Sequence, residues 1–185
     1  LSNKFDNVVI KQNIGTNYRV GNKDNMFTVG VSYQRTDLKS DQTFPLITSV
    51  DKSFDNILPN LMWNKKFDAK NRIRIMFRSN TNTPSVSQLQ NVINNTNPLA
   101  QSVGNPDLKQ QYSNTLSTRY TFTNTSKAKS FFANLFLTQT NNYIGNATYI
   151  ASNDSVLSSK DTLYRGSQLS KPINIDGYWS MRSFF

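Results

Sequence analysis

The sequence predicts an all-β fold of about seven long antiparallel strands that run up and down in chain order. Two observations predict it: apolar and polar residues alternate over long runs, and short and long connectors follow one another in turn. The composition agrees, because only 36% of the 185 residues are hydrophobic while 12% are aromatic. Strands with a single apolar face explain such a composition, and their regular alternation argues against a disordered chain.

The first two strands are predicted on either side of a short turn at residues 21–25. The clearest alternation follows this turn, where small polar residues separate Phe27, Val29, Val31 and Tyr33. The strand before the turn places Arg19 opposite its apolar residues, which are Val8, Ile10, Ile14, Tyr18 and Val20.

The third and fourth strands flank a second short turn at residues 68–71. The third strand has an apolar face from Ile57 to Trp63, although Pro59 within it cannot donate a ladder hydrogen bond. In the fourth strand, Ile73, Ile75 and Phe77 alternate with Arg72, Arg74 and Arg78.

The last three strands follow a long loop. Leu116, Tyr120 and Phe122 mark one strand, and Phe131, Ala133, Leu135 and Leu137 mark the next one after a short connector at 124–129. We expect a final single strand with Ile173, Ile175, Trp179 and Met181 on one face and Arg182 on the other.

The connectors and strand lengths favour a transmembrane β-barrel. Short connectors alternate with long ones near 40–52, 81–110 and 146–171, as in barrels with short periplasmic turns and long extracellular loops. The expected strands of roughly 10–17 residues also exceed the usual five or six of soluble sheets. No apolar run approaches the roughly 18 residues of a transmembrane helix. A soluble β-sandwich with long loops stays open as an alternative.

The loop at 81–110 has features of an ordered segment. Pro84 is expected to end the strand before it, and Ser85 with Gln88 predicts a capping box that opens a short helix through about Val92. Two Asn-Pro pairs and Gly104 then predict turns that lead into a strand near Gln111. We expect this loop to pack over or into the barrel mouth rather than to contact ligand directly.

This loop and four further stretches resemble the TonB-dependent-receptor-like outer-membrane β-barrel family of Bacteroidetes. The further stretches are DQTFP (41–45), NILPNLMWNKKF (56–67), NYIGNATYIA (142–151) and RGSQLSKPINIDGYW (165–179). The signature positions in the loop are Pro84, Ser85, Gln88, Leu89, Asn97, Pro98, Gly104, Asn105, Pro106 and Leu108.

The resemblance implies a barrel of about 22 strands that holds a plug domain in its lumen. Residues 1–185 would form about a third of this one outer-membrane barrel domain, and they contain no recognisable plug. The implied function is that of a receptor or transporter that takes up a nutrient ligand across the Gram-negative outer membrane. The implied partners are outer-membrane lipid, the plug domain of the same protein and the TonB energy-coupling system, while the ligand stays open.

Charge and parity predict where the basic residues lie. The net charge is +10, and an arginine facing lipid near the membrane midplane would cost about 2–4 kcal/mol. We therefore expect six arginines to face the lumen: Arg19, Arg72, Arg74, Arg78, Arg119 and Arg182. Acidic residues of the plug are their expected partners, and a basic path for anionic cargo is the alternative. Six aromatic residues are expected near strand ends, at the membrane interfaces: Tyr18, Tyr33, Trp63, Tyr112, Tyr120 and Trp179.

The sequence offers little basis for catalysis. It contains no histidine and no cysteine, and its aspartates are scattered without the spacing of a catalytic pair. We expect no enzymatic activity, no metal site, no cofactor and no nucleic-acid partner. Two other binding functions stay open as alternatives: a soluble carbohydrate-binding β-sandwich and a basic nucleic-acid-binding β protein.

Overall fold

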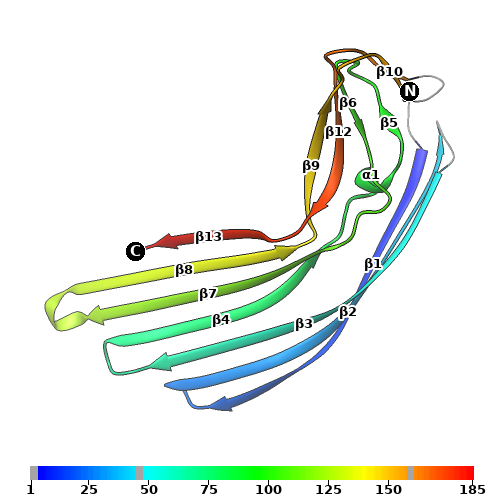
Figure 1. Cartoon of the computed structure of the whole chain (residues 1–185). Coiled ribbons are helices and arrows are strands. Elements are labelled where there is room, and N and C mark those ends of the chain that lie inside the picture. The colour runs from blue at the N-terminus through cyan, green and yellow to red at the C-terminus, as the bar shows by residue number, and fades with distance from the viewer. Residues whose placement is uncertain (1–3, 45–47, 158–160) are drawn as a thin grey trace.

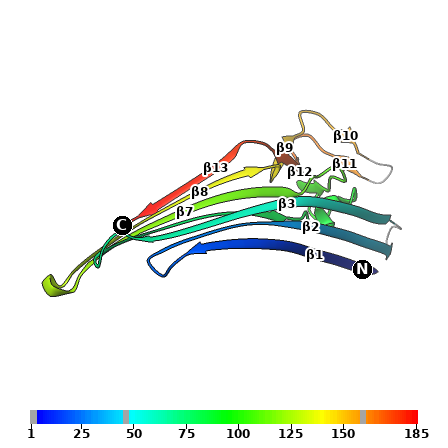
Figure 2. The same cartoon turned by 90° about the horizontal axis from the view of Figure 1, so that it is seen from below.

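The computed structural model describes residues 4–44, 48–157 and 161–185. Seven strands form one antiparallel sheet in the order β1-β2-β3-β4-β7-β8-β13 (Figure 1). Their bounds are β1 Lys4–Gly21, β2 Asn25–Phe44, β3 Thr48–Lys66, β4 Asn71–Asn82, β7 Gln111–Asn124, β8 Lys129–Asn141 and β13 Tyr178–Phe184. The expected number of strands and their up-and-down order are confirmed. The single curved sheet (Figure 2) also removes the β-sandwich alternative, which needs two long-stranded sheets packed face to face.

Smaller elements gather at one end of this sheet, opposite the short turns (Figure 1). A four-stranded sheet has the order β5-β6-β12-β9, and a short hairpin joins β10 to β11. The bounds are α1 Val86–Leu89, β5 Ile93–Asn94, β6 Ala100–Val103, β9 Tyr143–Ile150, β10 Ser155–Val156, β11 Thr162–Leu163 and β12 Gln168–Ile175, with a 3-10 turn η1 Thr125–Lys127 between β7 and β8. Within the described ranges, no helix is long and apolar enough to cross a membrane.

Two sequence-based boundaries are wrong. The expected long connector at 40–52 is mostly strand, because β2 continues to Phe44 and β3 begins at Thr48; the ladder there is supported by an ion pair between Lys39 and Asp51. The expected final strand is two strands, β12 and β13, which belong to different sheets. The break comes at Gly177, whose φ of +73° lies in the left-handed region that an L-residue in a strand does not adopt.

Strand register divides the sheet into two faces. The loop face is the one that carries Leu38, against which the 83–110 loop packs. The other, here called the apolar face, carries the row of β2 residues that alternate from Phe27 to Tyr33, and their β3 partners lie on it too. Apolar side chains on this face are open to the surroundings, and Ile14 on β1 is 75% exposed. All six aromatic residues predicted for membrane interfaces occupy register positions of the apolar face.

Candidate functional site

A small core fixes the 83–110 loop to the sheet. Leu89 of α1, Leu108 of the returning segment and Leu38 of β2 are each at most 2% exposed and form one cluster. Pro84, at the end of β4, is also fully buried. The loop therefore lies on the loop face of the sheet, and its expected role at the barrel mouth stays a prediction.

The predicted capping box at α1 is confirmed. The Ser85 hydroxyl accepts a hydrogen bond from the Gln88 amide at 3.3 Å, and the Gln88 side chain accepts one from the Ser85 amide at 2.9 Å. The helix ends at Leu89, however, and not near Val92 as expected. The reason is tertiary: at Gly104 the chain passes so close to the Gln90 carbonyl that a Cβ there would lie 2.1 Å from its oxygen.

The Asn-Pro turns direct the return of the chain. The Asn97 side chain accepts from the Leu99 amide at 3.0 Å and so forms the first turn. Its neighbour Pro98 is exposed. At the second turn, Asn105 accepts from the Asp107 amide at 3.1 Å and donates to the Pro172 carbonyl at 3.0 Å. Asn105 thus links the loop to β12, while Pro106 is exposed.

Hydrogen bonds of side-chain amides connect the 83–110 loop to its neighbouring strands. They were not predicted from the sequence. Asn174 of β12 accepts from the Lys109 amide at 2.8 Å and donates to the Lys109 carbonyl at 3.2 Å, as a neighbouring strand would. Gln110 donates to Thr83 at 2.7 Å and accepts from Asn56 of β3 at 2.6 Å. No local sequence pattern predicts these hydrogen bonds, because their partners lie far apart in the sequence.

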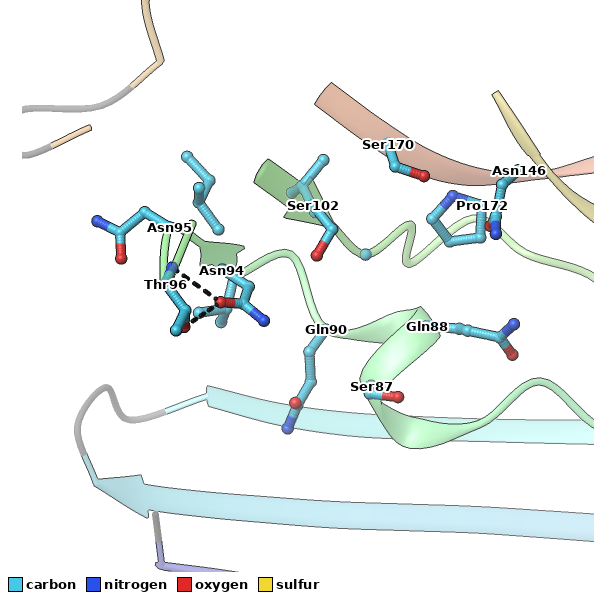
Figure 3. A pocket seen from close by; sticks show the side chains of 14 residues that line it. Ser87, Gln88, Gln90, Asn94, Asn95, Thr96, Ser102, Asn146, Ser170 and Pro172 are labelled. Atoms are coloured by element: carbon cyan, nitrogen blue, oxygen red, sulfur yellow. Dashed lines mark hydrogen bonds between the residues drawn. The ribbon is translucent and has the colours of Figure 1, made fainter. Parts of the chain in front are cut away.

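The loop and the small sheet line a half-open cavity of about 670 Å³ (Figure 3). One wall comes from α1 and the residues after it, and the other comes from β5, β6, β9 and β12. Five lining residues carry amides, four carry hydroxyls, and no charged side chain takes part. The lining residues are Ser87, Gln88, Gln90, Val92, Ile93, Asn94, Asn95, Thr96, Ser102, Val103, Gly104, Asn146, Ser170 and Pro172.

Some of these polar groups are already used within the protein. The Asn94 side chain accepts from the amide and hydroxyl of Thr96, as drawn in Figure 3, and Asn95 donates to Asp161 at 2.6 Å. Four others have side chains without a hydrogen-bond partner in the described part of the chain: Gln90, Ser102, Asn146 and Ser170. These groups are free to bind a ligand.

The register places all six predicted arginines on the loop face. Arg19 pairs with Thr28, Arg74 pairs with Arg119, and Arg182 pairs with Phe136. Arg72 and Arg78 share the parity of Arg74 on β4. None of the six forms an ion pair with a described residue; Arg74 donates to Asn64 at 2.6 Å and Arg119 donates to Asn134 at 2.8 Å.

This face carries positive charge without negative charge. Lys11, Lys52 and Lys66 lie on it as well. The aspartates of the seven strands are all on the apolar face, beyond its apolar residues: Asp6, Asp37, Asp41, Asp51 and Asp55. Since the chain contains no glutamate, the loop face of these described strands has no acidic residue.

Three phenylalanines at the β8–β13 edge of the loop face were missed in the sequence, where the Phe131-Phe132 doublet blurs the alternation. Phe132 and Phe136 of β8 and Phe184 of β13 share the parity of Arg182. The rings of Phe136 and Phe184 lie 5.6 Å apart. The separation of arginine from aromatic residues therefore holds on β4 but not at this edge of the sheet.

The apolar face ends in a charged cluster toward the long loops. Beyond Tyr33, Arg35 lies 3.3 Å from Asp37 and 3.9 Å from Asp55. A hydrogen bond from Ser53 and a second one from Arg35 hold the pKa of Asp37 below its usual range. Charges of this kind are costly in lipid, so the apolar band of β2 extends from Phe27 to Tyr33.

Comparison with known proteins identifies the class of the fold. The model of the outer membrane protein beta-barrel family matches residues 1–183. No curated protein sequence matches the chain. Solved structures do: a mutant of the ferric enterobactin receptor PfeA from Pseudomonas aeruginosa bound to enterobactin has a TM-score of 0.56 at 10% identity, over 97% of this chain and 33% of the receptor.

Two further structures give the same result. PfeA in complex with BCV-L6 has a TM-score of 0.55 at 10% identity, over 97% of this chain and 33% of that one. The siderophore receptor PirA of P. aeruginosa has a TM-score of 0.52 at 10% identity, over 96% of this chain and 39% of PirA. At this identity the likeness shows the fold alone, and the chain spans about a third of the length of these receptors.

Proposed function

Because the chain belongs to the outer membrane protein beta-barrel family, we propose that it forms about a third of the wall of a receptor that takes up a nutrient ligand. Its location is the outer membrane. The observation that carries the proposal is the division of the sheet into an exposed apolar face and a basic, polar loop face. A barrel wall between lipid and an aqueous lumen requires this division, whereas a catalytic role has no support from the residues present.

In this proposal the loop face lines the lumen, and the six arginines meet acidic residues of a plug domain elsewhere in the same protein. None of the six forms an ion pair with a residue that the structure describes, which supports this proposal, because guanidinium groups in a confined lumen are stabilised by carboxylates. The phenylalanine cluster at Phe136 and Phe184 would add an apolar contact for the same plug. A barrel of about 22 strands and TonB coupling complete the proposal; the source in Bacteroidetes stays a prediction.

A basic path for anionic cargo is the second candidate. The absence of acidic residues from the loop face of the described strands favours it. PfeA was solved with enterobactin, so ferric enterobactin is a suitable anionic probe.

Charge reversal on the loop face tests both candidates in the full-length protein. Arg74→Glu with Arg119→Glu should lower the melting temperature of the detergent-purified protein and expose the plug to protease, because acids would then face acids. Arg165→Glu is the matched control, since Arg165 is exposed in a loop outside the sheet. If the plug stays protected but uptake of ferric enterobactin falls, the cargo path is supported instead. If neither the protease protection of the plug nor the uptake of ferric enterobactin changes, the loop face does not line the lumen.

A further inference from the structure

We infer that the cavity between α1 and the small sheet binds a neutral, hydroxyl-rich ligand, namely a short oligosaccharide. The inference rests on the proposed receptor function and names the class of its ligand. The cavity volume of about 670 Å³ falls within the range of roughly 300–1,000 Å³ that is typical of small-molecule sites. Both walls come from residues of this chain.

The chemistry of the lining selects against charged ligands. Charged residues make up 17% of the chain, yet none of the 14 lining residues is charged. The six predicted arginines lie on the seven-stranded sheet, and no arginine belongs to the cavity lining. A carboxylate or phosphate bound there would find no counter-charge among the lining residues.

The same lining suits sugar hydroxyls. The free amides of Gln90 and Asn146 each offer both a donor and an acceptor, and the hydroxyls of Ser102 and Ser170 offer both in one atom. Neighbouring sugar hydroxyls need this mixture, since each both donates and accepts. In Figure 3 Ser102, Ser170 and Asn146 lie above the chain segment that carries Gln90, and the Gln90 side chain extends to the other side of that segment. Val92, Ile93, Val103 and Pro172 add an apolar surface for the C–H faces of a sugar ring.

The walls are held in place before a ligand arrives. The capping box shapes the start of α1, and Leu89 fixes the helix to β2. On the other wall, Asn105 bonds to Pro172, which itself lines the cavity. A prearranged site loses less conformational freedom on binding and so gains affinity.

The test uses the full-length protein in detergent and isothermal titration calorimetry. The probes are four neutral hexasaccharides, namely maltohexaose, cellohexaose, xylohexaose and mannohexaose, with hexagalacturonic acid as the charged counterpart. Ser102→Phe places a phenyl ring in the cavity and obstructs it, and Asn146→Leu replaces the amide with an apolar side chain of similar size. Asn153→Leu is the matched control, because Asn153 is exposed and lies outside the cavity.

We expect at least one neutral hexasaccharide to bind, with binding lost in Ser102→Phe, weakened at least tenfold in Asn146→Leu and unchanged in Asn153→Leu. Absence of binding by every neutral probe, or binding that survives Ser102→Phe, would overturn the inference. Binding of hexagalacturonic acid alone would overturn the assigned ligand class. Heat-modifiable migration on gels confirms that each variant is folded. An uptake assay with the bound sugar separates the two claims: binding without uptake contradicts the receptor function but leaves the site intact.

Discussion

Truncation of Leu89 to alanine should release the 83–110 loop from the sheet. Leu89 is 1% exposed and packs against Leu38 and Leu108, which are 1% and 2% exposed. Removing a fully buried leucine side chain costs about 2–5 kcal/mol, and we take about 3 kcal/mol here because the cluster is small. This is on the order of a hundredfold in the equilibrium between the docked and undocked loop, since about 1.4 kcal/mol is tenfold.

The effect should be local. The core of three fully buried leucines lies at the side of a sheet whose own strands are held by continuous backbone ladders. The loop can therefore open while the strands stay paired, as cooperative sub-units of proteins do. In Leu89→Ala, hydrogen exchange of peptides from 83–110 should accelerate on the order of a hundredfold, measured by mass spectrometry on the full-length protein in detergent.

Leu99→Ala is the matched control, because Leu99 lies in the same loop but is 69% exposed. Its expected effect is below about 0.5 kcal/mol. The reasoning is refuted if both variants exchange at the same rate. Equal loss of protection in β1 and β2 would also refute it, because the loop would then not be a separate unit.

Three other variants probe the two faces, the loop and a turn. Leu61→Arg, on the apolar face opposite Val29, should impair membrane insertion by about 2–4 kcal/mol, whereas Met62→Arg, one residue on and facing the other way, should insert normally. Folding into vesicles of controlled lipid composition measures both, and equal yields of the two variants would contradict the assignment of the faces. Gly104→Ala should destabilise the docked loop by about 1–3 kcal/mol, as overpacking of a core does, because the alanine Cβ would lie 2.1 Å from the Gln90 carbonyl oxygen at the end of α1. Hydrogen exchange of the amides in 83–110 should therefore accelerate, and an unchanged exchange rate would show that the loop can shift freely. Hydrogen bonds from the Asn71 side chain and from backbone amides lower the pKa of Asp68 in the turn before β4. The hydrogen bonds to the Asp68 carboxylate should thus stabilise the turn at a pH above the unfolded pKa of about 3.9, and this stabilisation should be lost as the pH falls through the pKa of Asp68 in the folded protein. The nuclear magnetic resonance signal of the Asn71 amide should change over this pH range in the wild type. A similar pH dependence in Asp68→Ala would assign the change to another group.

Much of the large sheet could be predicted because its determinants are local. The alternation from Phe27 to Tyr33 decides which side chains of β2 share a face, and the ladder transmits this parity to every neighbouring strand. The capping box at Ser85 and Gln88 is likewise a pattern of adjacent residues. Prediction failed where a neighbour distant in the sequence intervened, as when the approach of Gly104 ends α1 early.

The amino-acid sequence by itself determined the class of the fold, the number of long strands and that six arginines lie opposite the apolar residues of their strands, because a two-residue period and short turns need no distant partner. Only the tertiary structure decided where the long loops pack and that they line a half-open cavity without charged side chains. The bonds that make this arrangement join residues 65 and 67 positions apart, Lys109 to Asn174 and Asn105 to Pro172. Such contacts depend on how the whole chain brings the two loop segments together, and no short stretch of sequence encodes that distance.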